Sequence, residues 1–252
     1  MKKYGLTKRY YNESDVSHNQ KVGRIVQKTK DTYKVITNTG TLAAEISDRF
    51  EYGAGKLAEY PVVGDFVIVE INQQGFNSTV LRILKRKNEL MRKGEWEVNY
   101  DHIVASNIDT IFICISLDND FNTEKLKTYI SIATKCKAEP VLVLTECDSF
   151  NNIDSILNNI KEHTQEMDVI VTSRMDKDDC KSVKDYIQDG KTVVFTGPEH
   201  DKIRMINKLF RDIHFENDLV LLPEGGVLIN TPEMRELGII SSNTTKKFAE
   251  LH

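Results

Sequence analysis

The hydrophobic pattern changes near residue 105, and this change constrains the fold more than any other feature of the chain. Beyond it, short apolar runs alternate with amphipathic segments. The runs are Thr110–Ser116, Val141–Leu144, Val169–Val171, Thr192–Phe195, Leu219–Leu222 and Val227–Ile229. Strands that alternate with helices predict a doubly wound α/β structure with a largely parallel sheet. In such sheets ligands bind at the carboxyl ends of the strands, so the polar turns there are the candidate functional segments.

Three segments between these runs carry apolar side chains at helical spacing. They are Thr123–Cys136, with Leu126, Tyr129, Ile130 and Ala133; Asn151–His163, with Ile153, Ile156, Leu157 and Ile160; and Lys202–Ile213, with Ile203, Ile206, Leu209, Phe210 and Ile213. A stripe that repeats every three or four residues predicts a helix with one buried face.

The first 86 residues have a different pattern, with short β-branched runs separated by turn-forming residues. The expected strands are Gly23–Lys28, Tyr33–Thr37, Leu42–Ile46, Phe66–Ile71 and Ser78–Leu84. Five such strands predict a small barrel of the OB type, although a Tudor-like or SH3-like barrel has the same pattern. We therefore expect a barrel domain over residues 1–86, a basic linker over 87–104 and an α/β domain over 105–252.

Composition places the chain among ordinary globular proteins and excludes several classes. No apolar run is long enough for a membrane span, and no apolar stretch follows the charged N-terminus as it would in a signal peptide. The four cysteines, Cys114, Cys136, Cys147 and Cys180, are irregularly spaced, which favours free thiols over disulfides or zinc. We therefore expect a cytoplasmic protein with no membrane partner.

Charge is distributed unevenly along a chain whose net charge is −4. Residues 1–100 carry 17 Lys and Arg against 12 Asp and Glu, whereas the remainder carries 17 against 26. Any nucleic-acid contact is therefore expected in the N-terminal part, unless these charges only form a solvated surface. The candidate RNA-binding residues are Arg24, Lys28, Lys30, Lys85, Arg86, Lys87, Arg92 and Lys93.

Several segments together carry a family resemblance. They are Val62-Val63-Gly64-Asp65-Phe66-Val67, the linker 86–92, Ala105–Ile113, Ser116–Asn122 and Pro232–Leu237. In this order the chain, from about Tyr4 to Ile240, resembles the ribosome small subunit-dependent GTPase A family, the circularly permuted GTPases of YjeQ type. The segment that would read the base, Val141–Asp148, also precedes the one that would bind phosphates, Val193–Asn207, which is the reverse of an ordinary GTPase.

The resemblance implies an OB-fold domain, a circularly permuted P-loop GTPase domain, binding to 16S rRNA on the small ribosomal subunit, and a role in late subunit maturation. GTP or GDP with Mg²⁺ would be the ligands. The family also has a C-terminal zinc domain. No Cys/His cluster occurs before His252, so we expect neither that domain nor zinc.

The base-reading motif of the family is Asn-Lys-x-Asp, and the chain has Thr145-Glu146-Cys147-Asp148 in its place. Asp148 keeps the carboxylate that selects guanine, whereas Thr145 is a poor substitute for the asparagine amide. The companion loop keeps only Ser173. The alternative interpretation is a strand-end turn in which Asp148 caps the next helix.

The phosphate loop of the family follows the pattern G-x-x-x-x-G-K-[ST], in which backbone N–H groups surround the phosphates. Here residues 197–204 are one residue short of it. Gly197 remains and Lys202 aligns with the phosphate-binding lysine, but Asp201 replaces the second glycine and Pro198 removes an N–H donor. The alternative is a closed turn that binds no nucleotide.

The metal motif Asp-Thr-Pro-Gly is replaced by Asn230-Thr231-Pro232-Glu233, and the interval 208–228 is too short for the family's switch region. We therefore expect no catalytic or metal-binding residues and a pseudo-GTPase. The residues to test if nucleotide binding remains are Thr145, Asp148, Ser173, Gly197, Lys202, Asn230 and Thr231. An active GTP hydrolase and a protein-interaction module unrelated to the ribosome are the rival functions, and the oligomeric state is left open.

Overall fold

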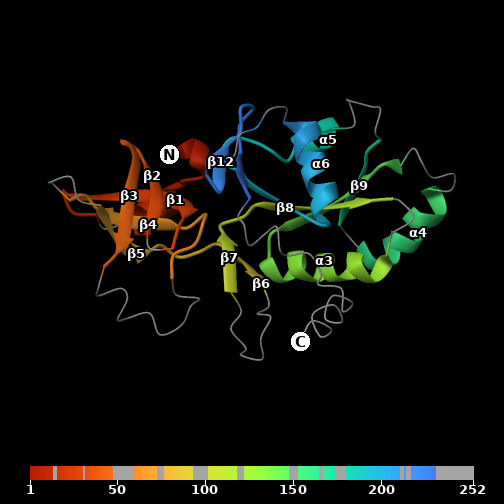
Figure 1. Cartoon of the computed structure of the whole chain (residues 1–252), viewed down its shortest axis with the longest axis horizontal. Helices are drawn as coiled ribbons and strands as arrows, with labels where there is room; N and C mark the ends of the chain where they lie inside the picture. Colours follow the sequence, from red (N-terminus) through yellow and green to blue (C-terminus); the bar gives the residue numbers. More distant parts are fainter. Residues whose placement is uncertain are drawn as a thin grey trace, which may run out of the picture.

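The computed structural model describes residues 1–13, 16–30, 32–47, 60–72, 77–92, 102–117, 122–147, 153–164, 167–173, 180–210, 213 and 217–230. Figure 1 shows a small barrel on the left and a sheet flanked by helices on the right. In these ranges no helix is long and apolar enough to cross a membrane. The four cysteines are free, as expected, and all four are buried.

Five strands close the barrel in the order β1-β2-β3-β5-β4. They are β1 (Gln20–Lys28), β2 (Tyr33–Thr37), β3 (Gly40–Ile46), β4 (Phe66–Glu70) and β5 (Ser78–Ile83). β3 and β5 are parallel and the other pairs are antiparallel. The β-branched side chains of Ile25, Val35 and Val80 fill the interior, because alternate residues of each strand point inward. The predicted five strands and OB-type barrel are confirmed.

The second part is a six-stranded sheet in the order β10-β9-β8-β11-β13-β12. Its strands are β8 (Thr110–Ser116), β9 (Glu139–Thr145), β10 (Asp168–Val171), β11 (Thr192–Thr196), β12 (Leu219–Leu221) and β13 (Val227–Ile229). Every neighbouring pair is parallel except β12 with β13. The predicted, largely parallel sheet is confirmed.

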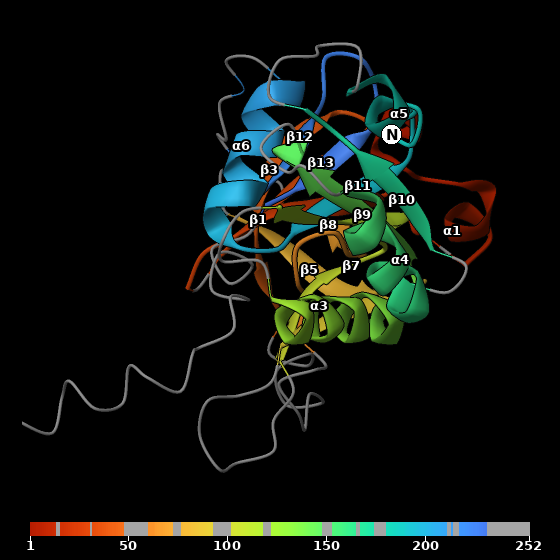
Figure 2. The same ribbon diagram turned by 90° about the vertical axis from the view of Figure 1, so that its right-hand side faces the viewer.

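Helices cover both faces of this sheet. They are α3 (Thr123–Cys136) and α4 (Ile153–Thr164) on one face, with α5 (Cys180–Lys184) and α6 (Glu199–Leu209) on the other, as Figures 1 and 2 show. The side chains of the central strand β8 alternate between two cores: Ile111 and Ile113 pack with the residues of α3, and Phe112 packs with those of α6. This alternation makes the sheet doubly wound, as predicted.

Two features differ from the expected pattern. Helix α6 begins at Glu199 rather than Lys202, and Ile203 on its predicted apolar stripe is 46% exposed, whereas Asp201 and Lys202 are buried. The segment expected to be a linker also contains two paired strands, β6 (Glu89–Arg92) and β7 (His102–Ser106). The side chains of Ile153 and Ile156, expected on the stripe of α4, lie outside the described residues.

The barrel, the sheet and the N-terminal segment meet around Arg24. This side chain is fully buried and donates hydrogen bonds to the carbonyls of Tyr4 (2.7 Å), Gly64 (3.1 Å) and Asn107 (3.3 Å). Its guanidinium also lies over the ring of Phe66. Burial lowers the pKa of Arg24 to about 10, so the side chain stays charged at neutral pH. One charged residue therefore joins three segments that are distant in sequence.

Candidate functional site

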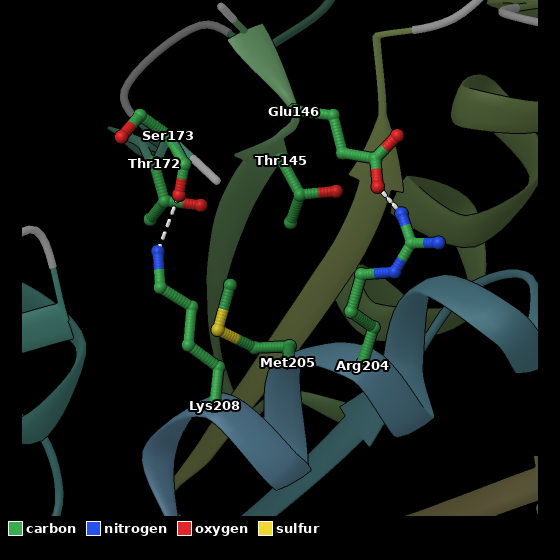
Figure 3. Close-up of a pocket in the computed structure, with 7 residues that line it drawn as sticks. All are labelled: Thr145, Glu146, Thr172, Ser173, Arg204, Met205 and Lys208. Atoms are coloured by element: carbon green, nitrogen blue, oxygen red, sulfur yellow. Dashed lines mark hydrogen bonds and ion pairs between the residues drawn. The ribbon is translucent and has the colours of Figure 1, made fainter. Parts of the chain in front are cut away.

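The strands β9, β10 and β11 run in the same direction, so their carboxyl ends meet at one edge of the sheet. A pocket of about 400 Å³ opens at this edge between the ends of β9 and β10 and the helix α6. Its lining consists of Thr145, Glu146, Thr172, Ser173, Arg204, Met205 and Lys208 (Figure 3). The site thus lies where ligands bind in parallel sheets.

Two charged contacts tie α6 to the strand ends across this pocket. Glu146, in a left-handed conformation after β9, forms an ion pair with Arg204. Lys208, one helical turn further on, donates a hydrogen bond to the carbonyl of Ser173 after β10. Figure 3 shows the two contacts on opposite sides of Met205. The hydroxyl of Thr145 also lines the pocket and is buried with no hydrogen-bond partner among the described residues, although buried hydroxyls normally have one.

The structure describes only some of the residues predicted to contact the base. Thr145 and Ser173 come together in the pocket, as the hypothesis required, whereas Asp148 lies outside the described residues. Arg204 and Lys208 were not among the site residues predicted from the sequence. Their spacing of four residues on one helix places them on the same face, and this signal was available in the sequence.

The turn between β11 and α6 does not have the shape of a phosphate loop. β11 ends at Thr196 and α6 begins at Glu199, so only Gly197 and Pro198 connect them. The residues expected to surround phosphates, 199–202, form the first turn of the helix instead. Gly197 has a φ of 127°, and a Cβ added there would lie 2.1 Å from the carbonyl oxygen of Cys114. This glycine permits close packing against β8.

Asp201 and Lys202 point into the protein rather than toward a ligand. A carboxylate oxygen of Asp201 accepts a hydrogen bond from the backbone N–H of Ser116 at 2.8 Å, at the carboxyl end of β8. Lys202 is 2% exposed, so its predicted role as the phosphate-binding lysine would require its side chain to move toward the ligand. Burial, and then the charge of Asp201, raise the pKa of the Cys114 thiol nearby. The acidic side chain of Asp201 and the basic side chain of Lys202 are thus both buried at this turn.

The residues expected near the metal are described only in part. Asn230 follows β13 and its N–H donates to the carbonyl of Asp218 at 2.7 Å, whereas Thr231 lies outside the described residues. Ile203, in the position of the metal-binding hydroxyl, has no oxygen and faces solvent. Within the described ranges, no three His, Cys, Asp or Glu side chains form a cluster that could hold a metal ion. At the two described positions expected near the metal, the side chains of Ile203 and Asn230 offer neither a hydroxyl nor a carboxylate.

The candidate RNA-binding residues divide into two groups. Lys28, Lys30, Lys85 and Lys87 are exposed. Arg24 is buried at the junction described above, and its expected RNA contact is wrong because its donors are used by three carbonyls. Arg86 is also corrected, since it forms an ion pair with Asp65 and its side chain is 10% exposed. The side chain of Arg92 and all of Lys93 lie outside the described residues.

Comparisons with known proteins identify the family. The family model described as RsgA GTPase matches residues 83–217. A Small ribosomal subunit biogenesis GTPase RsgA 2 of Lactiplantibacillus plantarum is 30% identical over 99% of this chain and 75% of its own length. A Small ribosomal subunit biogenesis GTPase RsgA 1 of Bacteroides thetaiotaomicron is 30% identical over 91% of this chain and 68% of its own length.

Solved structures agree on the fold. The crystal structure of YjeQ from Thermotoga maritima has a TM-score of 0.66 at 19% identity and covers 87% of this chain and 77% of its own. That of YloQ, a circularly permuted GTPase, has a TM-score of 0.60 at 19% identity and covers 87% of this chain and 73% of its own. The barrel, the strand order and the matched sequence lead to one conclusion: the chain belongs to the RsgA GTPase family.

Proposed function

We propose that this protein associates with the small ribosomal subunit in the cytoplasm and that its GTPase-type domain is a scaffold. Guanine nucleotide binding is weak or absent, and GTP hydrolysis does not occur. Relatives named for small ribosomal subunit biogenesis support the ribosomal partner. The departures of the three nucleotide motifs from the family pattern support the proposed loss of GTP binding and hydrolysis.

One observation carries the second part of this proposal: β11 enters α6 through only Gly197 and Pro198. A phosphate loop needs several backbone N–H groups directed at the ligand, and proline has none. The buried carboxylate of Asp201 at the same edge of the sheet would repel a polyphosphate. The side chain of Lys202 would have to leave the protein interior before it could compensate. Phosphoryl transfer requires groups that position the phosphates and bind Mg²⁺, and the residues of this turn do neither.

A second candidate function, an active GTP hydrolase stimulated by the small subunit, is favoured by the pocket in Figure 3. Its volume of about 400 Å³ falls within the range of small-molecule sites. The unpartnered hydroxyl of Thr145 could bond to a heterocycle. The affinity for a nucleotide would therefore have to come from contacts of the pocket with the base, because no phosphate loop contributes to it.

Calorimetric titration separates these two functions. GDP, a non-hydrolysable GTP analogue and guanosine are each titrated with and without Mg²⁺. The scaffold proposal expects GDP to bind no tighter than guanosine, because the phosphates gain no contacts, and Mg²⁺ to have no effect. Micromolar GDP binding that Mg²⁺ strengthens would contradict the scaffold proposal and make GTP hydrolysis stimulated by the small subunit the next assay.

Matched variants locate any binding that is observed. Thr145→Val removes the unpartnered hydroxyl in the pocket, and Thr196→Val removes the other buried threonine hydroxyl without a partner, which does not line the pocket. Binding at the pocket is weakened by Thr145→Val and unaffected by Thr196→Val. Equal effects of the two variants would exclude the pocket as the binding site.

Co-sedimentation with purified small ribosomal subunits tests the partner. We expect association that weakens as salt rises and that is the same with GDP, with a GTP analogue and without nucleotide. Association that requires the GTP analogue would contradict the scaffold role. Failure to co-sediment at low salt would favour the third function, a protein-interaction module that has left the ribosome.

A further inference from the structure

A second cleft, of about 460 Å³, lies at the end of the sheet opposite the pocket. Asp109, just before β8, and Thr192, at the start of β11, line it, whereas the pocket lies at the carboxyl ends of the strands. Its other walls come from the N-terminal segment and from the connection between barrel and sheet. We call it the basic cleft and define it by Lys2, Arg9, Lys87 and Lys191.

The walls of the basic cleft are fixed by internal contacts. Gly5, with φ of 79°, packs so closely on the turn before β11 that an added Cβ would lie 2.9 Å from the carbonyl oxygen of Gly190. The hydroxyl of Tyr10 on α1 (Lys8–Glu13) donates to the side-chain oxygen of Asn107 at 2.9 Å, and Arg24 holds the carbonyl of Tyr4. The N-terminal segment is therefore docked on the sheet, and the cleft is a built feature of the fold.

Positive charge is in excess inside this cleft. One carboxylate oxygen of Asp109 faces the ammonium groups of both Lys87, at 2.7 Å, and Lys191, at 3.6 Å, so one negative charge is shared by two positive ones. Apart from the buried Arg24, the lining has four basic side chains and two acidic ones, an excess of two positive charges. The chain as a whole has a net charge of −4, so this excess is local.

The charge pattern favours a phosphate chain over a small anion. A polyanion that places several phosphates among these side chains releases a counterion for each, and this gain grows with the number of contacts. The guanidinium of Arg9 is held at the cleft by a hydrogen bond to the backbone carbonyl of Lys85 at 3.3 Å. The ammonium groups of long, half-exposed lysines can contact the phosphates of a flexible chain in several arrangements, because they require no fixed geometry.

We propose that the basic cleft binds the phosphodiester backbone of a single RNA strand. This inference rests on the proposed association with the small ribosomal subunit and names the surface that makes the contact. It differs from the sequence-based expectation, which put the contact on the barrel through Lys28 and Lys30. The barrel face is less suitable, because the carboxylate of Asp218 accepts a hydrogen bond from the backbone N–H of Lys28, which brings a negative charge next to it.

The test measures binding of a short fluorescein-labelled single-stranded RNA to the full chain by fluorescence anisotropy over a range of salt. Lys2→Ala with Lys191→Ala removes two charges from the basic cleft. Lys28→Ala with Lys30→Ala removes two exposed charges from the barrel and serves as the matched control. We expect the cleft variant to bind about tenfold or more weakly and to reduce the slope of log affinity against log salt by about 1.4, as expected for two lost contacts to a single strand. The control should change affinity less than about threefold.

A third variant distinguishes electrostatic attraction from a structural role. Asp189 lines the cleft and is exposed, so Asp189→Asn should tighten RNA binding about two- to threefold by removing a repulsive charge. A merely structural cleft would not gain affinity from this change. Unchanged melting temperatures for all variants verify that they are folded.

Three results would overturn the inference. The control could lose as much affinity as the cleft variant, which would move the contact to the barrel. Pyrophosphate could displace the RNA when the two are present at comparable concentrations, which would make this a small-anion site. The chain could co-sediment with small subunits yet bind no RNA, in which case the proposed function stands and the basic cleft is not its contact.

Discussion

Replacing Arg24 by methionine should destabilise the protein by about 2–4 kcal/mol. The carbonyls of Tyr4 and Asn107 would lose the guanidinium donor, whereas that of Gly64 keeps a bond from the side-chain amide of Asn107 at 3.0 Å. Two hydrogen bonds from a charged donor contribute about 1.5–3 kcal/mol each. The variant no longer has a charge to desolvate, and this gain offsets part of the loss. The orphaned carbonyls nevertheless decide the sign, because methionine cannot donate to them.

Equilibrium urea unfolding followed by circular dichroism measures this effect. With a slope of about 2–3 kcal/mol per molar urea, the midpoint should fall by about 1 M. Arg82→Met, at an exposed position of β5, is the matched control and should change the unfolding free energy by less than about 0.5 kcal/mol. An equally small effect of Arg24→Met would refute the view that this side chain joins the barrel to the sheet.

Three further predictions concern other parts of the structure. Burial acts to raise the pKa of Asp109, but hydrogen bonds from Lys87 and the N–H of Thr192 outweigh it and lower the pKa below the ordinary 3.8. The contribution of Asp109 to stability is therefore present above that pH and lost in more acidic solution, so the difference in unfolding free energy between wild type and Asp109→Asn in urea should shrink from pH 7 to pH 3. Gly197→Ala should destabilise by about 2–4 kcal/mol, whereas Gly40→Ala, with a similar φ of 124° but no atom within 4 Å of the added Cβ, should show only the backbone strain; equal losses would exclude the contact with β8. The four buried thiols should not react with Ellman's reagent until the protein unfolds, and one rapid equivalent in the native state would contradict their burial.

The fold could be predicted because its signals are periodic and local. The apolar run Thr110–Ser116 is long enough to be a central strand, and Leu126, Tyr129 and Ala133 mark one face of a helix whose bounds the structure reproduces. The strand pair β6–β7 was missed because its strands have only four and five residues and their polar and apolar side chains do not alternate. Its pairing is determined by tertiary contacts such as the burial of Leu90 against the core of the sheet.

The site was harder to predict, because a motif alignment does not say where a helix begins. Lys202 aligns with the phosphate-binding lysine only if residues 199–202 form a loop. They form a helix, and Asp201 then falls on the same face as Met205 and Leu209, four and eight residues later, which is the buried face. The spacing of these three residues was a signal that the sequence analysis did not use. The Arg24 network had no local signal, since its acceptors are 20, 40 and 83 residues away.

The contacts of α6 support the proposal that this domain is a scaffold. In a nucleotide-binding protein the ligand adds stability by mass action, about 2.7 kcal/mol at a hundredfold excess over its dissociation constant. Here the same edge of the sheet is held by the protein itself: Asp201 bonds to the end of β8, Arg204 pairs with Glu146 after β9, and Lys208 bonds to Ser173 after β10. Each contact joins the helix to a different strand, and together they fix the edge that a ligand would otherwise order. The scaffold role proposed above therefore predicts that association with a partner is controlled by something other than the state of a bound nucleotide.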